Sequence, residues 1–411
     1  MNIWYFSAYD RPHGHSSRTY DFARMLHRRG HSVSIFTNSI CHYTKEDRIK
    51  DHRKWLDEDI EGLHITWLKT PPYENNLQRF INMLWNAYRA VQAGKARNDR
   101  PDIIVGPTVP LFTAWAAQRL AVRFHCPFFL EIRDIWPQTF VDQGKMSAHS
   151  PLFHLLRQLE KSLYKKATTI VSTLPLAAEH VAESGSDPEK VIWIPNGVDL
   201  EHYSEIDDLH QSNDGITHFV YVGTFGSVND LIPIIDACKL VNDVNPNWKL
   251  TLVGGGQQQK EIESRIRIHG LEAQILLPGY VKKHEVPAIV SAGDAMMISL
   301  RPDNYFRFGC NLNKMYDYFA AGRPVIFAGD VPNDPVRLSG AGISVPARAT
   351  EGLAKAMISF MDLSIEQKRA LGHLARRYAL ENYDVKKLAE ILENKMLECF
   401  KQYQSDVTKA S

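Results

Sequence analysis

The chain contains 411 residues, more than one ordinary hydrophobic core takes up, so two domains of roughly 200 residues each are expected. Its 48 basic and 47 acidic residues leave a net charge of +1, which argues against a nucleic-acid binder held by a broad positive surface. The five cysteines are scattered without a C-x-x-C pair, which suits a reducing compartment, so we expect a cytoplasmic protein. No signal peptide or membrane span is expected from the apolar pattern.

Apolar strand candidates alternate with amphipathic helices along both halves, which is typical of an α/β fold with doubly wound parallel sheets. In the first half we expect strands at residues 2–7, 32–37, 64–68, 102–106, 128–132, 168–172 and 191–195. In the second half we expect them at residues 218–223, 249–254, 274–279, 295–300, 324–329 and 342–346.

A polar stretch rich in Asp and Asn, residues 196–217, separates the two sets of strands and shows no helical or strand period. This stretch predicts an N-terminal domain at residues 1–205 and a C-terminal domain at residues 206–380. Residues 381–411 form a last helix that we expect to return to the N-terminal domain, because no sheet is left for it to cover. Its apolar stripe consists of Val385, Leu388, Ile391, Leu392 and Met396.

The loop after the first strand is the first candidate ligand contact. It contains Gly14 and leads into a helix that carries Arg18 in its first turn. Backbone N–H groups and a helix N-terminus at this point can receive an anionic ligand, and Arg18 adds a cation. The loop lacks the G-x-G-x-x-G spacing of a dinucleotide site, so an ordinary βαβ unit is an equally good interpretation.

Several strings in both halves together resemble the family-4 retaining glycosyltransferases of the GT-B fold. The strings are "RRGHSVSIFT", "EIRDIWPQTF", "IPNGVD", "LVGGGQQQKEIE", "PGYVKKHEVPAIVSAGDAMMISL" and "NKMYDYFAAGRPVIFA". The second and last of these are most similar to the branch that assembles bacterial surface polysaccharides such as O-antigen and capsule. The resemblance implies two Rossmann-like domains that face each other across a cleft.

The resemblance also implies a nucleotide-sugar donor, with uridine as the expected base and no further cofactor. A family glutamate at the position of Asp317 accepts hydrogen bonds from the ribose, and the loop from Cys310 to Asn313 presents N–H groups to the diphosphate. Lys314, Arg301 and Arg307 are the nearest charges able to balance the leaving group. The implied donor-binding residues are Thr224, Gly226, Gly255, Tyr280, Val281, Arg307, Asn311, Leu312, Asn313 and Asp317.

This chain departs from the family pattern at several positions. Gly309 stands where the family commonly has a second glutamate, and Thr224 with Asn229 or Asp230 stands where an Arg and a Lys are usual. Many relatives carry a histidine near the acceptor, where this chain offers Arg133 and Asp134. These two residues join Lys314 and Arg301 as catalytic candidates, although a local salt bridge between Arg133 and Asp134 is an alternative.

Two further patterns concern partners. Asp57 and Asp59 match the D-x-D string of metal-dependent transferases, but their charge-rich run is more typical of a solvated helical face, so no metal site is predicted. The predicted helix after residue 75 has an apolar stripe with basic residues nearby, which could lie on a membrane and admit a polyprenol-linked acceptor. Packing of the stripe on its own sheet is the alternative. The stripe consists of Leu77, Phe80, Ile81, Leu84, Trp85, Tyr88 and Val91.

The expected function is transfer of a hexosyl or N-acetylhexosaminyl group to a hydroxyl of a glycan or lipid-linked acceptor, with retention and without a metal. Two alternatives remain at this point: a sugar-nucleotide epimerase on the same fold, and a non-catalytic scaffold that binds sugar nucleotides.

Overall fold

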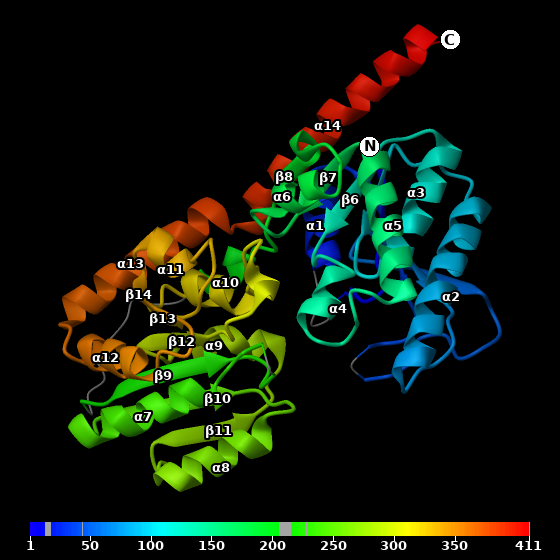
Figure 1. Cartoon of the computed structure of the whole chain (residues 1–411). Helices are drawn as coiled ribbons and strands as arrows, with labels where there is room; N and C mark the ends of the chain where they lie inside the picture. Colours follow the sequence, from blue (N-terminus) through cyan, green and yellow to red (C-terminus); the bar gives the residue numbers. More distant parts are fainter. Residues whose placement is uncertain (13–17, 43, 205–214, 227, 411) are drawn as a thin grey trace. The chain divides into compact units, whose positions relative to one another are not determined.

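A computed structural model describes residues 1–12, 18–42, 44–204, 215–226 and 228–410. The chain divides into two compact units, one formed by Met1–Asn196 with Val385–Ser411 and the other by Gly197–Asp384 (Figure 1). The predicted boundary between residues 205 and 206 lies outside the described residues. At the second boundary, the chain passes back to the first unit at Val385 rather than at residue 381.

The first unit contains an eight-stranded sheet in its described part, with the order β3-β4-β2-β1-β5-β6-β7-β8. Its strand pairs are parallel except for β3 with β4. The strand order reverses between β1 and β5, and ligands of doubly wound folds bind beyond the carboxyl ends of the strands at such a reversal. The strands are β1 (Asn2–Phe6), β2 (Ser32–Asn38), β3 (Trp55–Ile60), β4 (Leu63–Leu68), β5 (Ile103–Pro107), β6 (Phe128–Ile132), β7 (Thr169–Ser172) and β8 (Val191–Trp193).

Helix α14 (Val385–Ala410) belongs to the first unit and packs there against α1 (Arg18–Arg28). Val385, Leu388 and Met396 share one buried cluster with residues of β1, β2 and α1, which confirms that the last helix covers the first domain. The other helices of this unit are α2 (Asn76–Ala96), α3 (Leu111–Phe124), α4 (Gln138–Asp142), α5 (Pro151–Lys166), α6 (Ala177–Glu183) and the 3₁₀ turn η1 (Pro188–Lys190).

Helix α2 buries a face of small and polar residues and leaves its apolar stripe outward. Met83, Ala87 and Ala90 are buried, whereas Leu77 is 71% and Tyr88 is 52% exposed. The alternative in which this stripe packs on its own sheet is therefore wrong for most of its members. Among the described residues, none of the helices combines the length and the apolar character needed to span a bilayer.

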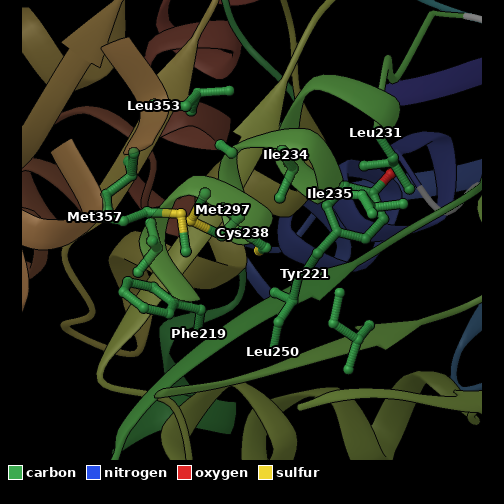
Figure 2. Packing of buried hydrophobic residues seen from close by; sticks show 14 of the residues in the cluster. Phe219, Tyr221, Leu231, Ile234, Ile235, Cys238, Leu250, Met297, Leu353 and Met357 are labelled. Atoms are coloured by element: carbon green, nitrogen blue, oxygen red, sulfur yellow. The ribbon is translucent and has the colours of Figure 1, made fainter. Parts of the chain in front are cut away.

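The second unit contains a six-stranded parallel sheet with the order β11-β10-β9-β12-β13-β14, which reverses between β9 and β12. Figure 2 shows its core, in which Tyr221 and Leu250 of the sheet lie near Ile234 and Cys238 of α7, and Met357 of α12 belongs to the same cluster. The strands are β9 (Thr217–Val222), β10 (Trp248–Val253), β11 (Ile275–Gly279), β12 (Ala295–Ser299), β13 (Val325–Ala328) and β14 (Gly342–Val345).

Helices cover both faces of this second sheet, as expected for a doubly wound fold (Figure 1). They are α7 (Ile232–Val244), α8 (Gln259–His269), α9 (Val286–Ser291), α10 (Asn313–Ala320), α11 (Pro335–Ser339), α12 (Thr350–Met361) and α13 (Ile365–Asn382). Three 3₁₀ turns accompany them in the described residues: η2 (Leu200–Tyr203), η3 (Lys283–Glu285) and η4 (Asn304–Phe306).

The D-x-D string lies on a strand, so its assignment to a solvated helical face is wrong. Strand β3 pairs antiparallel with β4 through a turn at Glu61 and Gly62, both of which have positive φ, as a two-residue hairpin turn requires. The carboxylates of Asp57 and Asp59 lie 3.4 Å and 3.2 Å from the two ring nitrogens of His64. A charged edge strand and a charged helical face share a composition, and only the pairing with β4 distinguishes them.

Candidate functional site

Two glycine turns meet at the carboxyl edge of the sheet in the second unit. After β9 the chain runs through Gly223, and after β10 it runs through Gly254 and Gly255. The backbone N–H of Phe225 donates to the Gly255 carbonyl at 2.8 Å, which joins the two turns. A Cβ atom on Gly254 would lie 2.0 Å from the Gly223 carbonyl oxygen, so only glycine allows this approach. The turns therefore form a close-packed floor at the reversal of strand order.

Lys314 reaches this floor from the first turn of α10. Its Nζ donates to the hydroxyl of Tyr221 at 2.9 Å and to Oδ1 of Asn229 at 2.7 Å, and it lies 4.4 Å from the centroid of the Tyr221 ring. Neither partner is an acid. Burial lowers the pKa of Lys314 to about 7, because removal from water disfavours the ammonium form. Among the described residues no carboxylate pairs with this amine, so a bound anion would provide its counter-charge.

Asn229 and Thr224 occupy positions where the family pattern has cations, and here they hold Lys314 in place. The Asn229 amide donates to the Thr224 carbonyl at 3.1 Å and to its hydroxyl at 3.2 Å. The neighbouring Asp230 is buried and accepts from Nε of Arg348 at 2.7 Å. Asn229 and Thr224 therefore contribute neutral hydrogen bonds, and Lys314 provides the positive charge beside the two glycine turns.

Asp317 lies one helical turn after Lys314 and is half-buried. The hydroxyl of Tyr203, in η2, donates to Oδ1 of Asp317 at 2.7 Å. Burial raises the pKa of Asp317, and the hydrogen bond from Tyr203 acts in the opposite direction. Tyr203 is itself tied to the helix region, because Nη1 of Arg376 donates to its carbonyl at 2.9 Å. The bond from Tyr203 holds the carboxylate in one orientation and occupies one of its two oxygens.

The loop before α10 is fixed by its own side chains. The Cys310 N–H donates to Oδ1 of Asn333 at 2.8 Å, and the Asn333 amide returns a bond to the Cys310 carbonyl at 3.0 Å. The Tyr316 hydroxyl donates to Oδ1 of Asn311. Leu312 lies at the N-cap and provides no side-chain cap, so the positive end of the helix dipole is not capped by that residue. The Cys310 N–H is used within the protein, which removes it from the expected set of diphosphate donors.

Gly309 has a physical reason to replace the second family acid. Its φ is 101°, in the region that favours glycine, and its N–H donates to the Phe306 carbonyl at 2.9 Å. A glutamate here would strain the backbone. The backbone conformation at this position therefore favours glycine over any residue with a side chain.

The remaining candidates of the second unit lie at its surface. Arg301 follows β12, its N–H donates to the Val228 carbonyl at 3.1 Å, and its side chain is exposed. Arg307 is exposed and lies 4.5 Å over the ring of Phe308. The 75% exposed Tyr280 lies beside Gly255, since a Cβ there would come within 2.9 Å of its ring. Gly226 and Val281 are half-buried, and Asn313, the first residue of α10, is exposed. The structure thus links Lys314 to Thr224 through Asn229 and places Gly255 beside Tyr280.

The first unit holds a balanced cluster of two arginines and two acids at the carboxyl ends of β1 and β6. Arg133 donates to Glu131, Asp10 and Thr19, each at 2.6 Å, and Nε of Arg18 donates to Glu131 at 3.0 Å. Burial alone would raise the pKa of Glu131, but Arg133 and Arg18 hold it below its usual range. In the described residues Arg133 forms its ion pairs with Asp10 and Glu131, and not with Asp134 as in the alternative expectation.

Asp134 and Arg18 have different surroundings from those expected. The Asp134 carbonyl accepts from the Thr108 hydroxyl at 3.1 Å, and Asp134 is half-buried. Arg18 is buried, with Nη1 2.5 Å from the Pro195 carbonyl oxygen. Its charge is already balanced by Glu131, and its contact with an anionic ligand stays a prediction. Gly14 lies outside the described residues.

Comparisons with known families agree with this architecture. Residues 13–197 match a family described as Glycosyl transferase 4-like domain, and residues 217–362 match Glycosyl transferases group 1. Together the two matches span most of the chain. The chain is a glycosyltransferase of the GT-B type. The surface-polysaccharide branch is a finer assignment than these matches provide.

Solved structures share the fold of this glycosyltransferase at low sequence identity. Sucrose-phosphate synthase from Thermosynechococcus elongatus superposes with a TM-score of 0.72 at 16% identity, covering 100% of both chains. HepE of Anabaena in complex with UDP-glucose gives 0.68 at 15% identity, covering 97% of this chain and 100% of its own. The catalytic domain of Starch Synthase IV from Arabidopsis thaliana, bound to ADP and acarbose, gives 0.70 at 14%, covering 97% and 99%. No curated protein sequence matches this chain significantly.

Sequence reasoning missed the partners that orient the candidate side chains of this glycosyltransferase. Tyr203 and Tyr221 were not predicted, nor were Glu131 and Asp10. Tyr203 follows the "IPNGVD" string closely, and Tyr221 alternates with Phe219 along β9, so each had only the signal of an ordinary core tyrosine. Their roles follow from contacts between residues far apart in the chain.

Proposed function

We propose that this glycosyltransferase moves a sugar from a nucleoside diphosphate donor, with uridine as the base, to a hydroxyl of a glycan or lipid-linked acceptor. The observation that carries the proposal is Lys314, an amine at the reversal between β9 and β12 that is bound only by the neutral Tyr221 and Asn229 among the described residues. Asp317, one turn away, supplies an oriented carboxylate for a ribose hydroxyl. The UDP-glucose complex of HepE supports the choice of base.

In the proposed reaction, most of the rate acceleration comes from stabilising the negative charge on the leaving diphosphate. The bond between the anomeric carbon and the phosphate oxygen breaks, and the diphosphate gains negative charge as an oxocarbenium-like transition state forms. Lys314 takes up a proton when the donor binds and then balances this charge from a fixed position. The acceptor oxygen forms the new bond on the same face of the sugar, and its proton passes to the departing phosphate oxygen. The anomeric configuration is therefore retained.

Because the ammonium of Lys314 balances the charge of the leaving diphosphate, the proposed reaction needs no metal ion. The donor and the acceptor are the only small molecules that it requires. Asp57 and Asp59 support this view because both carboxylates pair with His64 on an edge strand. Turnover should persist in excess EDTA. Loss of turnover in EDTA that Mn²⁺ or Mg²⁺ restores would contradict the proposal.

Lysine protonation gives a binding test that does not need the acceptor. Because the pKa of free Lys314 is about 7 and the bound diphosphate should raise it, UDP binding at pH 8 should take up a proton. Calorimetry in two buffers of different ionisation enthalpy measures this uptake, and Lys314→Met should abolish it. Equal uptake in the two proteins would contradict the assignment of Lys314 to the phosphates.

We further propose that the protein acts in the cytoplasm, in bacterial surface-polysaccharide assembly, and contacts the inner face of the membrane. Its five cysteines form no disulfide in the part of the chain that the structure describes, and Cys41 is the only one of them that is not buried. The exposed stripe of α2 supports the membrane contact: Trp85 and Tyr88 lie edge to face, and the guanidinium of Arg89 lies 5.1 Å from the Trp85 ring. An aromatic stripe with a cation at its border suits an anionic lipid surface.

Vesicle sedimentation tests the membrane contact. Binding to vesicles that contain phosphatidylglycerol should exceed binding to pure phosphatidylcholine, and the pair Leu77→Ser with Trp85→Ser should remove it. Leu155→Ser is the matched control, since Leu155 is 67% exposed on a different helix. Equal sedimentation of the double variant and the control would contradict this contact.

A panel of UDP-, GDP-, dTDP- and ADP-sugars, each with and without lipid-linked and soluble acceptors, tests the activity. Release of UDP only when acceptor is present supports transfer. An altered free sugar nucleotide would show epimerisation instead, and tight nucleotide binding without turnover would show a scaffold.

A further inference from the structure

A second group of cations lies at the carboxyl edge of the first unit, next to the balanced cluster that contains Arg133 and Asp10. Tyr9 and Arg11 follow β1, His42 and Lys45 follow β2, Tyr73 follows β4, and Arg79 lies near the start of α2. Strands β4, β2 and β1 are consecutive neighbours in the sheet, so their carboxyl ends meet at one edge. These six residues are called the Tyr9 cluster below.

Aromatic rings hold the cations of the Tyr9 cluster. Nη2 of Arg79 donates to the Tyr9 hydroxyl at 3.2 Å, and its guanidinium lies 5.4 Å from the centroid of that ring. Nζ of Lys45 lies 4.0 Å from the centroid of the Tyr73 ring. His42 joins the two parts, since Nδ1 lies 2.6 Å from the Tyr73 hydroxyl and its ring contacts that of Tyr9 at 5.3 Å. The cluster is therefore a continuous assembly and not a set of separate surface charges.

Arg11 extends the cluster along the same edge. Its Nη2 donates to the Asn38 carbonyl at 3.1 Å, and its guanidinium lies 5.3 Å from the Trp67 ring. Within the described residues, none of the three cations Arg11, Lys45 and Arg79 forms an ion pair with a carboxylate. Three nearby acids pair with other cations: Asp10 with Arg133 at 2.6 Å, Asp47 with Lys69 at 3.0 Å, and Glu58 with Arg48 at 2.7 Å.

The electrostatic state of the cluster reflects this excess of positive charge. Burial lowers the pKa of Lys45, and the charge of Arg79 lowers it further. Burial, with Arg79 and Lys45, lowers the pKa of His42 to about 4, so His42 is neutral at pH 7. Nε of Arg79 is buried without a hydrogen-bond partner in the described residues. Partly desolvated cations that form no ion pair with a carboxylate are unfavourable, and an anion bound among them reduces that cost.

We infer that Arg11, Lys45 and Arg79 bind a phosphate group of the acceptor at the carboxyl edge of β1, β2 and β4. The inference rests on the proposed function, because it gives the first unit the acceptor and leaves the donor to Lys314. Arginine and lysine held over aromatic rings are pre-oriented for a phosphoryl group. The phosphate can belong to a soluble sugar phosphate or to the diphosphate of a polyprenol-linked sugar, which present the same group to the three cations.

Inorganic pyrophosphate is the probe for this site, used with the full-length Lys314→Ala protein so that the donor contact is weakened. Calorimetry should show pyrophosphate bound to this protein. Adding Lys45→Asn and Arg79→Met should weaken that binding at least tenfold, as expected for the loss of charged hydrogen bonds. Asparagine is chosen because Lys45 has a φ of 62°, which asparagine tolerates. Lys50→Asn is the matched control, since Lys50 is exposed in the same segment.

The outcomes separate this inference from the proposed function. Unchanged pyrophosphate affinity in the triple variant, or no binding to Lys314→Ala, overturns the inference. The Lys45→Asn and Arg79→Met double variant, with Lys314 intact, should bind UDP as tightly as the wild-type protein does. If the wild-type protein does not bind UDP, the proposed function is overturned instead of this inference. Replacing Arg79→Met by Arg79→Lys in the triple variant should recover part of the pyrophosphate affinity. A loss of affinity caused by misfolding would not be recovered in this way.

Competition identifies the source of the phosphate. Displacement of pyrophosphate by a soluble sugar phosphate, or by a polyprenyl diphosphate-linked sugar in detergent micelles, supports the acceptor site and names its ligand. Displacement by neither compound contradicts the acceptor assignment.

Discussion

Replacement of Lys314 by methionine should make the protein more stable and less active. The pKa of Lys314 falls from 10.5 to about 7 in the folded protein, which corresponds to a penalty on the order of 4 kcal/mol at pH 7. Methionine removes this penalty but also removes the bonds to Tyr221 and Asn229, worth about 1 kcal/mol each. The net gain in the free energy of unfolding should be about 1–3 kcal/mol at pH 7.

The sign of the effect should depend on pH. A lysine whose folded pKa is lowered leaves the unfolded chain with more bound protons between about pH 7 and 10.5, so this group adds stability as the pH rises through that window. The advantage of Lys314→Met over wild type should therefore shrink from pH 7, vanish at about pH 9, where the remaining penalty equals the about 2 kcal/mol of the two lost hydrogen bonds, and reverse above it. Comparing the two proteins at each pH removes the contribution of every other titrating group.

Urea unfolding, followed by fluorescence, measures the two free energies, and single-turnover rates measure the activity. Lys314→Met should lower the rate by about 10² to 10³, with a smaller effect on donor affinity. Lys239→Met is the control, because Lys239 forms an exposed pair with Asp243 and should change stability by less than about 1 kcal/mol. A destabilised Lys314→Met protein with the same deficit at every pH, or an unchanged rate, would refute the reasoning.

Asp317→Ala should weaken the binding of UDP and of the donor alike by about 1.5–3 kcal/mol, and unchanged calorimetric affinity would remove the ribose assignment. Tyr203→Phe should raise the pKa of Asp317 further, because it deletes a hydrogen bond to the carboxylate, so UDP affinity should decline at a higher pH than in wild type as the solution is acidified. Arg133→Met should destabilise the fold by about 3–5 kcal/mol in urea unfolding, since Asp10 and Glu131 lose their shared partner; a loss below about 1 kcal/mol would show that water replaces it. Gly309→Glu should lower stability and fail to improve turnover, because the residue has a φ of 101°; a faster enzyme would contradict the account of this position.

Strand positions could be predicted well because period and composition are local properties. Each of the thirteen strands expected from the sequence has a counterpart in the structure, and β3 is the strand in the described residues that was not expected. Its residues are half-buried or exposed, so it lacks the apolar run that marks the parallel strands. The last helix was also predictable, since an amphipathic stripe without a sheet of its own must find another surface.

The geometry of the candidate site could be predicted only in part. Lys314 and Asp317 were found by family resemblance, but Tyr203 lies 114 residues before Asp317, and Tyr221 lies 93 residues before Lys314. Asp10 lies 123 residues before Arg133. The charge balance of Arg133 arises from such distant contacts, and the low pKa of Lys314 arises from burial. A local sequence pattern encodes neither.

The anomeric configuration of the product tests the central proposal most directly. Proton NMR can follow the anomeric signal of a UDP-sugar during reaction with a phosphorylated acceptor, for the wild-type protein beside Lys314→Met. The account predicts UDP release that requires the acceptor, a product with the same anomeric configuration as the donor, and a rate about 10² to 10³ lower in the variant. An inverted product, UDP release without acceptor, or equal rates in the two proteins would contradict it.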